Sequence, residues 1–306
     1  MFRKILLCTD LTPASDALID CVAALKEVGT KEVVLTHVVD VANTPGLDEM
    51  TVQDAEPVLE RQKQELEKQG VKVELAIPLG VPARTLHEIA EKRDVSVILI
   101  GSHGKGMVQA ATLGSVSAGL LHLTRRPVLL ARTRLLEEGK EGTLCRRIFE
   151  RVLLPTDFSE TSERALDYVG KMALETRCPV TLMHAIEANP DDPADARARE
   201  EEAYYLLEAK KRRLQTLGAA QVVIDLVYGK AAQEIVARTG IGDFSLVVMG
   251  GQGKGFIEEL FLGSTANEVA RHAAAPLLFI PTQHFFRSKE GRLGAAENSL
   301  SNIPGW

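Results

Sequence analysis

Two short glycine motifs have the residue types and spacing to hold a phosphate group. Gly101-Ser-His-Gly104 is followed after nine residues by Gly114-Ser115. Gly250-Gly-Gln-Gly253 is followed after nine residues by Gly263-Ser264. Each motif lies between an apolar run typical of a buried strand and a segment with a helical pattern. Glycine lets the main chain approach a ligand, and a helix start offers free N–H groups and a positive dipole end. The motifs therefore predict two anion-binding sites on two similar domains.

A carboxylate recurs beside each motif. Thr9-Asp10 follows the first strand of the first copy, and Thr156-Asp157 follows that of the second. Ligands of open parallel sheets bind beyond the carboxyl ends of the strands, where the winding direction reverses. If strands one and four are neighbours there, the aspartate and the glycine loop share one crevice. A carboxylate repels phosphate but accepts hydrogen bonds from ribose hydroxyls or a purine amino group, so the crevice predicts a nucleotide site.

Each of these residues also has a structural interpretation. A lone aspartate after a strand is usually a turn or N-cap residue, although recurrence beside the glycine loop favours a ligand. Ser115 and Ser264 could be N-caps, a role compatible with phosphate contact. His37 and His184 recur after strand two, where a structural role is favoured. We found no nucleophile–base pair and no metal-ligand spacing, so we expect neither catalytic nor metal-binding residues.

Strand and helix patterns alternate along both copies. The first copy predicts strands over 4–9, 32–39, 71–77, 95–100 and 127–131, with helices over 12–28, 52–68, 83–92 and 114–123. The second predicts strands over 151–156, 179–186, 220–228, 244–249 and 276–280, with helices over 160–176, 230–239 and 263–273 and a long charged helix ending near 217. Apolar strands separated by helices indicate an α/β fold with parallel sheets covered on both faces.

The repeat divides the chain into two domains. Asp157 follows Asp10 by 147 residues, and Gly250 follows Gly101 by 149. A nearly constant offset over a whole domain indicates tandem duplication. We expect domains at 1–133 and 150–282, a linker at 134–149 and a polar extension at 283–306.

Composition excludes several classes of function. The chain has 306 residues, 45% hydrophobic and 25% charged, and a formal net charge of −6. These values are typical of a soluble globular protein, and the negative charge disfavours nucleic acid as a partner. No apolar run is long enough to span a membrane or serve as a signal peptide. Four scattered cysteines predict reduced thiols and a cytoplasmic location.

The sequence resembles the universal stress protein family in its tandem-domain form. ATP-binding members of that family carry G-x2-G-x9-G-[ST] after strand four and an aspartate after strand one, and both copies match over about residues 2–132 and 150–281. The resemblance implies a five-stranded parallel sheet of order 3-2-1-4-5 in each of two doubly wound domains. It also implies that strands 127–131 and 276–280 pair within one chain as an internal pseudo-dimer, with a homodimer of whole chains left open.

The resemblance implies a set of nucleotide contacts in each copy. In the first they are Cys8, Thr9, Asp10, Val38, Ile100, Gly101, Gly104, Gly114, Ser115, Val116 and Ser117. In the second they are Pro155, Thr156, Asp157, Ala185, Met249, Gly250, Gly253, Gly263, Ser264 and Thr265. Two departures stand out. Cys8 occupies a position where proline is usual, and Ala266 replaces the final hydroxyl of the second motif. The second site is therefore expected to bind phosphate more weakly, by roughly 0.5–1.5 kcal/mol.

The implied ligand is ATP or AMP, with Mg²⁺ as a candidate companion. The favoured function is a nucleotide-dependent stress-response regulator with an unidentified protein partner. Two alternatives stay open: a slow ATPase or self-phosphorylating enzyme that uses Ser115 or Ser264, and a ligand-free interaction module in which the glycines are only structural.

Overall fold

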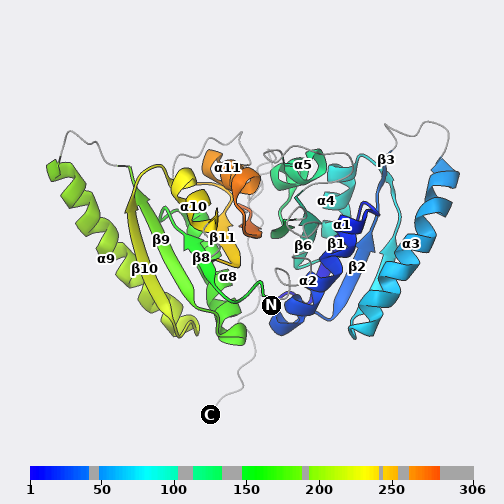
Figure 1. The fold of residues 1–306 in the computed structure, drawn as a ribbon, viewed down its shortest axis with the longest axis horizontal. Helices are drawn as coiled ribbons and strands as arrows, with labels where there is room; N and C mark the ends of the chain where they lie inside the picture. Colours follow the sequence, from blue (N-terminus) through cyan, green and yellow to red (C-terminus); the bar gives the residue numbers. More distant parts are fainter. Residues whose placement is uncertain are drawn as a thin grey trace, which may run out of the picture.

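The structure is a computed structural model that describes residues 1–40, 48–102, 113–132, 147–187, 193–240, 244–253 and 262–282. The two halves of the chain lie next to each other and repeat the same arrangement, with α3 and α9 at the two outer ends (Figure 1). The predicted linker and extension lie almost wholly outside the described residues.

The two halves contain the same succession of main strands and helices. The first half comprises β1 (Lys4–Cys8), α1 (Pro13–Asp16), α2 (Leu18–Leu25), the 3₁₀ helix η1 (Lys26–Val28), β2 (Glu32–Thr36), β3 (Val39–Asp40), α3 (Asp48–Lys68), β4 (Lys72–Ala76), β5 (Leu79–Gly80), α4 (Pro82–Lys92), β6 (Val97–Gly101), α5 (Ser115–Leu123) and β7 (Val128–Ala131). The second comprises β8 (Val152–Pro155), α8 (Glu160–Thr176), β9 (Val180–Ile186), α9 (Pro193–Leu217), β10 (Val222–Tyr228), α10 (Ala231–Gly240), β11 (Leu246–Gly250), α11 (Ser264–His272) and β12 (Leu277–Ile280).

All the main strands belong to one ten-stranded sheet. Its order is β10-β9-β8-β11-β12-β7-β6-β1-β2-β4, so each half has the order 3-2-1-4-5 that the family resemblance implies. Pairing within each half is parallel. The predicted α/β fold of two doubly wound five-stranded units is confirmed.

One core lies on each face of this sheet and runs through both halves. On one face, side chains of α2, α3, α8 and α9 pack on the strands; on the other, those of α4, α5, α10 and α11 do so. Strands buried on both sides need apolar residues at successive positions rather than at alternate ones. Every residue of β6 is buried, whereas β4 at the sheet edge is only partly buried.

The halves join through an antiparallel pair, β7 with β12. Leu130 lies opposite Leu277, Leu129 opposite Leu278, and Val128 opposite Phe279. The expected pairing of the fifth strands within one chain is therefore confirmed. It covers an edge that each five-stranded unit would otherwise leave open, so only β4 and β10 remain as edges of the large sheet.

Three local features differ from the sequence predictions. The helix predicted over 12–28 is divided, with Ala17 in a turn between α1 and α2 and a 3₁₀ turn at the end. A small two-stranded parallel sheet, β3 with β5, was not predicted. Cys21 is disulfide-bonded, so the expectation of reduced thiols is wrong for that residue, while Cys8 and Cys178 are free and buried.

A buried arginine connects the two halves next to the seam between β7 and β12. Arg132 donates from Nη1 to Ala270 O (2.6 Å), from Nη2 to Val269 O (2.9 Å) and from Nε to Ala275 O (3.1 Å). Two of these carbonyls belong to the last turn of α11, where a cation also interacts favourably with the helix dipole. Burial lowers the pKa of Arg132 to about 10, so the side chain stays charged at neutral pH.

We expect Arg132→Met to lower the free energy of unfolding by about 2–4 kcal/mol, because three buried carbonyl oxygens lose their donor. Urea denaturation measures the difference. Arg84→Met is the control, because that side chain is 77% exposed and pairs with Glu88 on the same helix. It should change stability by less than about 0.5 kcal/mol. Equal stability of Arg132→Met and wild type would contradict the assigned role.

Candidate functional site

The site forms where strands one and four of each half run side by side. β1 pairs with β6 in the first half, and β8 with β11 in the second. These are the strands at which the winding direction of each half reverses. The predicted adjacency of strands one and four is therefore confirmed in both halves.

The two aspartates lie in the same tight turn. Asp10 Oδ1 accepts hydrogen bonds from the N–H (3.1 Å) and the hydroxyl (2.6 Å) of Thr12, and Asp157 Oδ1 accepts the same pair from Ser159. The intervening residue has left-handed backbone in each copy, with φ of 65° at Leu11 and 62° at Phe158. The structural interpretation as a turn residue is thus correct for one carboxylate oxygen.

The second carboxylate oxygen has a different environment. Asp10 Oδ2 is buried and has no hydrogen-bond partner among the residues that the structure describes. Asp157 Oδ2 faces the glycine loop so closely that a Cβ on Gly253 would lie 2.5 Å from it. A buried carboxylate oxygen without a donor is costly, and a ligand hydroxyl is one way to satisfy it.

The recurring histidines hold the aspartate segments in place. His37 Nδ1 donates to Thr9 O (3.0 Å), and His184 Nδ1 donates to Thr156 O (2.7 Å). Each bond ties the end of strand two to the end of strand one. The structural role favoured for both histidines is what the geometry shows.

Both helices after the glycine loops begin without a side-chain cap. Gly114 and Gly263 are the N-cap residues of α5 and α11, and neither helix has a side-chain cap hydrogen bond. The interpretation of Ser115 and Ser264 as N-caps is therefore wrong, because each is the first helical residue. The first N–H groups of an uncapped helix point outward from its end and can bind an anion.

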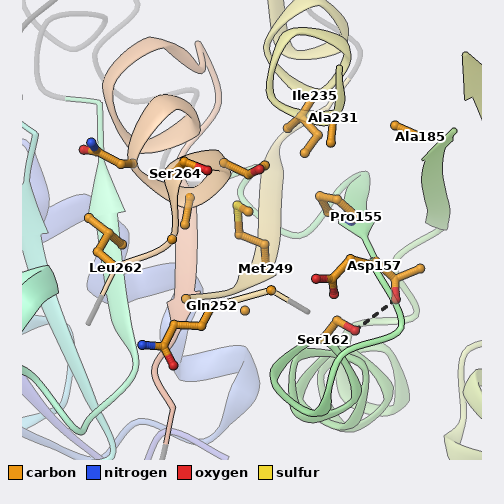
Figure 2. A pocket seen from close by; sticks show the side chains of 18 of the residues that line it. Pro155, Asp157, Ser162, Ala185, Ala231, Ile235, Met249, Gln252, Leu262 and Ser264 are labelled. Carbon is orange, nitrogen blue, oxygen red and sulfur yellow. Dashed lines mark hydrogen bonds between the residues drawn. The ribbon is translucent and has the colours of Figure 1, made fainter. Parts of the chain in front are cut away.

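A crevice of about 600 Å³ opens at this place in the second half. All ten residues predicted for the second site line it. Figure 2 shows Pro155, Asp157, Met249 and Ser264 around the same space. Its lining is apolar on the side of Ala185, Ala231 and Ile235, and polar on the side of Asp157, the glycine loop and the start of α11.

A side chain is excluded at the loop glycines for different reasons. A Cβ on Gly250 would lie 2.8 Å from the backbone of Thr161 in α8, so this glycine permits helix packing. A Cβ on Gly263 would lie 3.2 Å from Gly251 O, and Gly263 N donates to that oxygen at 2.7 Å. Gly114 N donates to Ser102 O in the same way at 2.8 Å. The loops are thus closed onto the helix starts by main-chain bonds.

The first half places its predicted residues on the matching elements. Cys8, Thr9 and Asp10 end and follow β1, Val38 follows β2, Ile100 and Gly101 end β6, and Gly114, Ser115, Val116 and Ser117 start α5. Gly104 lies outside the described residues. Burial raises the pKa of the Cys8 thiol, which keeps it neutral.

Ser117 has a hydrogen bond that was not predicted. Its hydroxyl is buried and donates to Gly101 O at 2.7 Å, linking the start of α5 to the end of β6. The hydroxyl hydrogen is therefore not available to a phosphate in this conformation. Ala266 takes the same place in the second half, so the difference between the copies concerns local support as well as ligand contact.

Sequence reasoning missed several residues of the crevice: Ser162, Met183, Ala231, Ile235, Gly251, Gln252, Leu262, Ala266, Asn267 and His122. Ser162 could have been found from the repeat, because Ser15 occupies the corresponding position of the first copy. The Ser162 hydroxyl bonds to that of Thr156 (3.1 Å), as the Ser15 hydroxyl does to that of Thr9 (2.8 Å). His122 had no such signal. It lies in α5 of the first half and reaches the crevice of the second only because β7 pairs with β12.

No group of three His, Cys, Asp or Glu side chains in the described ranges could hold a metal ion. No helix within those ranges is long and apolar enough to cross a membrane.

Comparisons with known proteins point to one family. The model of the universal stress protein family matches residues 1–132 and 149–281. A universal stress protein of Methanocaldococcus jannaschii is 29% identical over 157 residues, covering 44% of this chain and 97% of its own. One of Synechocystis is 24% identical over 253 residues, covering 82% of this chain and 79% of its own.

A solved structure agrees with these matches. The crystal structure of a universal stress protein from Archaeoglobus fulgidus superposes with a TM-score of 0.70 and 26% identity, covering 91% of this chain and 98% of that one. The family match thus covers both copies of the repeat, and the fold matches over nearly the whole chain. The chain belongs to the universal stress protein family.

Proposed function

We propose that the protein binds an adenine nucleotide, ATP or AMP, in a crevice of each domain and acts as a nucleotide-dependent regulator. The observation that carries the proposal is the crevice of the second domain, where Asp157, the glycine loop and the uncapped start of α11 line one space. A volume of about 600 Å³ lies within the range of roughly 300–1,000 Å³ common for small-molecule sites.

The phosphate end of the proposed site is the N-terminus of α11. Gly263 is the N-cap and supplies no side chain to satisfy the first helical N–H groups. Ser264 and Thr265 line the crevice and add hydroxyl donors beside these amides. Phosphate is a suitable ligand because the amides and the helix dipole both favour negative charge.

The ribose and base would lie toward strand one. Asp157 keeps one carboxylate oxygen in its turn and presents the other toward the glycine loop. A ribose hydroxyl is a neutral donor to a carboxylate and does not meet the repulsion that a phosphate would meet. Beyond it, Ala185, Ala231 and Ile235 offer an apolar surface for a planar base (Figure 2).

A regulatory role follows from the position of α11. Its N-terminus borders the crevice, and its last turn is held by Arg132 of the other domain. A ligand that shifts or stiffens this helix therefore acts directly on the contact between domains. This arrangement supports a nucleotide-dependent regulator more directly than a ligand-free module.

We expect wild-type protein to bind ATP in isothermal titration calorimetry, and Gly263→Asp to weaken binding in the second domain by tenfold or more, about 1.4 kcal/mol. The N-cap backbone, with φ −67° and ψ 152°, suits aspartate, so its carboxylate would cap α11 and repel the phosphates. Gly263→Asn is the matched control, because it caps without charge and should weaken binding less. Absence of binding of ATP, ADP and AMP to wild type would refute the proposal.

Asp157→Asn should weaken ATP binding by about tenfold or more, because a charged acceptor of a ribose hydroxyl is lost while the Oδ1 acceptor of the turn is kept. The matched ligand is 2′,3′-dideoxy-ATP. Wild type should bind it more weakly than ATP, and Asp157→Asn should bind the two nearly alike. If the variant still discriminated between them as wild type does, Asp157 would not contact the ribose.

His122→Asn should weaken ATP binding to the second domain by roughly two- to tenfold, the effect of one hydrogen bond. The measurement uses a Gly114→Asp background, in which the first site is blocked. His272→Asn is the control, since His272 is an exposed histidine of α11 that contacts Glu268 and does not line the crevice. Equal affinities of the two variants would show that the first domain adds nothing to the second site.

A further inference from the structure

The hydroxyl of Thr36 is buried and unpaired. Thr36 is the last residue of β2 and is 1% exposed, and its Oγ1 has no hydrogen-bond partner among the residues that the structure describes. Buried hydroxyl groups are nearly always paired, because an unpaired one has lost its bonds to water without replacement. The Thr36 side chain therefore lacks a partner that a ligand can supply.

Other buried threonines of the first domain are paired. Thr30, just before β2, donates from Oγ1 to Phe2 O at 2.7 Å. Thr9 Oγ1 and Ser15 Oγ form a hydrogen bond of 2.8 Å. Because these hydroxyls are satisfied within the fold, burial of a threonine in this domain does not by itself leave its hydroxyl unpaired.

Thr36 lies on the side of the sheet that faces the first site. In β2, Val33 and Leu35 belong to the core under α2 and α3, and Val34 belongs to the core on the other face. Because side chains alternate along a strand, Thr36 points with Val34 toward α4 and α5. The strands β1 and β2 run side by side (Figure 1), and their register places Thr36 next to Cys8, which belongs to the same core as Val34.

The repeat identifies what this position faces. Met183 follows Thr36 by 147 residues, the same offset as between the two aspartates. In the second half, Met183 lies next to Pro155 in the register, and both line the crevice together with Ala185. Pro155 and Ala185 lie on one side of that space in Figure 2. Thr36 therefore occupies in the first site the place that Met183 has in the second, at the end proposed for the base.

Thr36 and Met183 offer a base different interactions. The thioether of Met183 makes apolar contacts with any planar ring. The shorter Thr36 offers an O–H donor and an oxygen acceptor, and its branched Cβ restricts the directions in which the hydroxyl points. The neighbouring Cys8 thiol is neutral, because burial raises its pKa. Hydrogen bonding rather than charge therefore distinguishes this end of the first site from that of the second.

We propose that the Thr36 hydroxyl hydrogen-bonds the base of the nucleotide in the first site and makes this site more selective for the base than the second. The inference rests on the proposed function and adds a residue that determines specificity. With phosphates at α5 and the ribose at Asp10, a purine extends from strand one over strand two. Its six-membered ring, which is farthest from the ribose, carries the ring nitrogens and the exocyclic amino group that reach Thr36. A base without a polar atom there leaves the hydroxyl unpaired and binds more weakly.

The test compares Thr36→Val in two backgrounds by calorimetry with ATP. With Gly263→Asp, which blocks the second site, Thr36→Val should weaken binding about three- to tenfold, because a side chain of the same shape has lost the hydrogen bond to the base. With Gly114→Asp, which blocks the first site, the same substitution should leave binding unchanged. Thr36→Ser keeps the hydroxyl and should retain most of the affinity of the first site.

Stability of the ligand-free protein separates this role from a structural one. Thr36→Val removes an unpaired hydroxyl, so the midpoint of urea denaturation should stay the same or rise. Thr30→Val is the matched control, because its hydroxyl is paired with Phe2 O. It should lower the midpoint and leave ATP binding unchanged. A lower midpoint for Thr36→Val, as for Thr30→Val, would assign the hydroxyl to the fold and overturn the inference.

AMP and ribose 5-phosphate separate the base from the rest of the ligand. In the Gly263→Asp protein, Thr36→Val should weaken the binding of AMP and leave that of ribose 5-phosphate unchanged, as followed by phosphorus NMR. An equal loss for both ligands would place the hydroxyl at the ribose or phosphate and contradict the inference. Unchanged ATP affinity of Thr36→Val at the first site, or no ATP binding to Gly263→Asp while wild type binds, would overturn the inference alone. Absence of nucleotide binding to wild type would instead refute the proposed function.

Discussion

The short antiparallel pairing of β12 with β7 determines how the two domains are placed relative to each other. In it, Leu277, Leu278 and Phe279 lie opposite Leu130, Leu129 and Val128. It turns two five-stranded units into one sheet with two continuous cores. It brings His122 of α5 to the crevice of the other domain and sets Arg132 under the last turn of α11. Two separate domains with the same sequences would lack both contacts.

The copies share a backbone plan but differ in the side chains that complete it. Both aspartates occupy the same left-handed turn, and both glycine loops close on a helix start with a main-chain bond. Around this plan the first domain uses Ser117 to support its loop, and the second uses Ala266. The copies thus share the residues that shape the crevice and differ in the side chains around it.

The fold could be predicted from the sequence because parallel strands that are buried on both faces are continuous apolar runs. The same succession of runs occurs in both copies of the repeat. Sequence reasoning placed Asp157 and the second glycine loop together because both follow neighbouring strands. It failed where tertiary contacts determine the local structure. The N-cap role of Gly263 and the bond from Ser117 to Gly101 depend on exact loop closure. The position of His122 at the second crevice depends on the pairing of β7 with β12, whose residues are far apart in the chain, and no local pattern contains that information.

The central claim is that strand one and the start of α11 form the two ends of one nucleotide site. A crystal structure grown with a non-hydrolysable ATP analogue tests it most directly. The account predicts the phosphates at the first N–H groups of α11, a ribose hydroxyl on Asp157, and the base against Ala185 and Ile235. An empty crevice at saturating analogue, or an analogue bound with its phosphates away from α11, would contradict it.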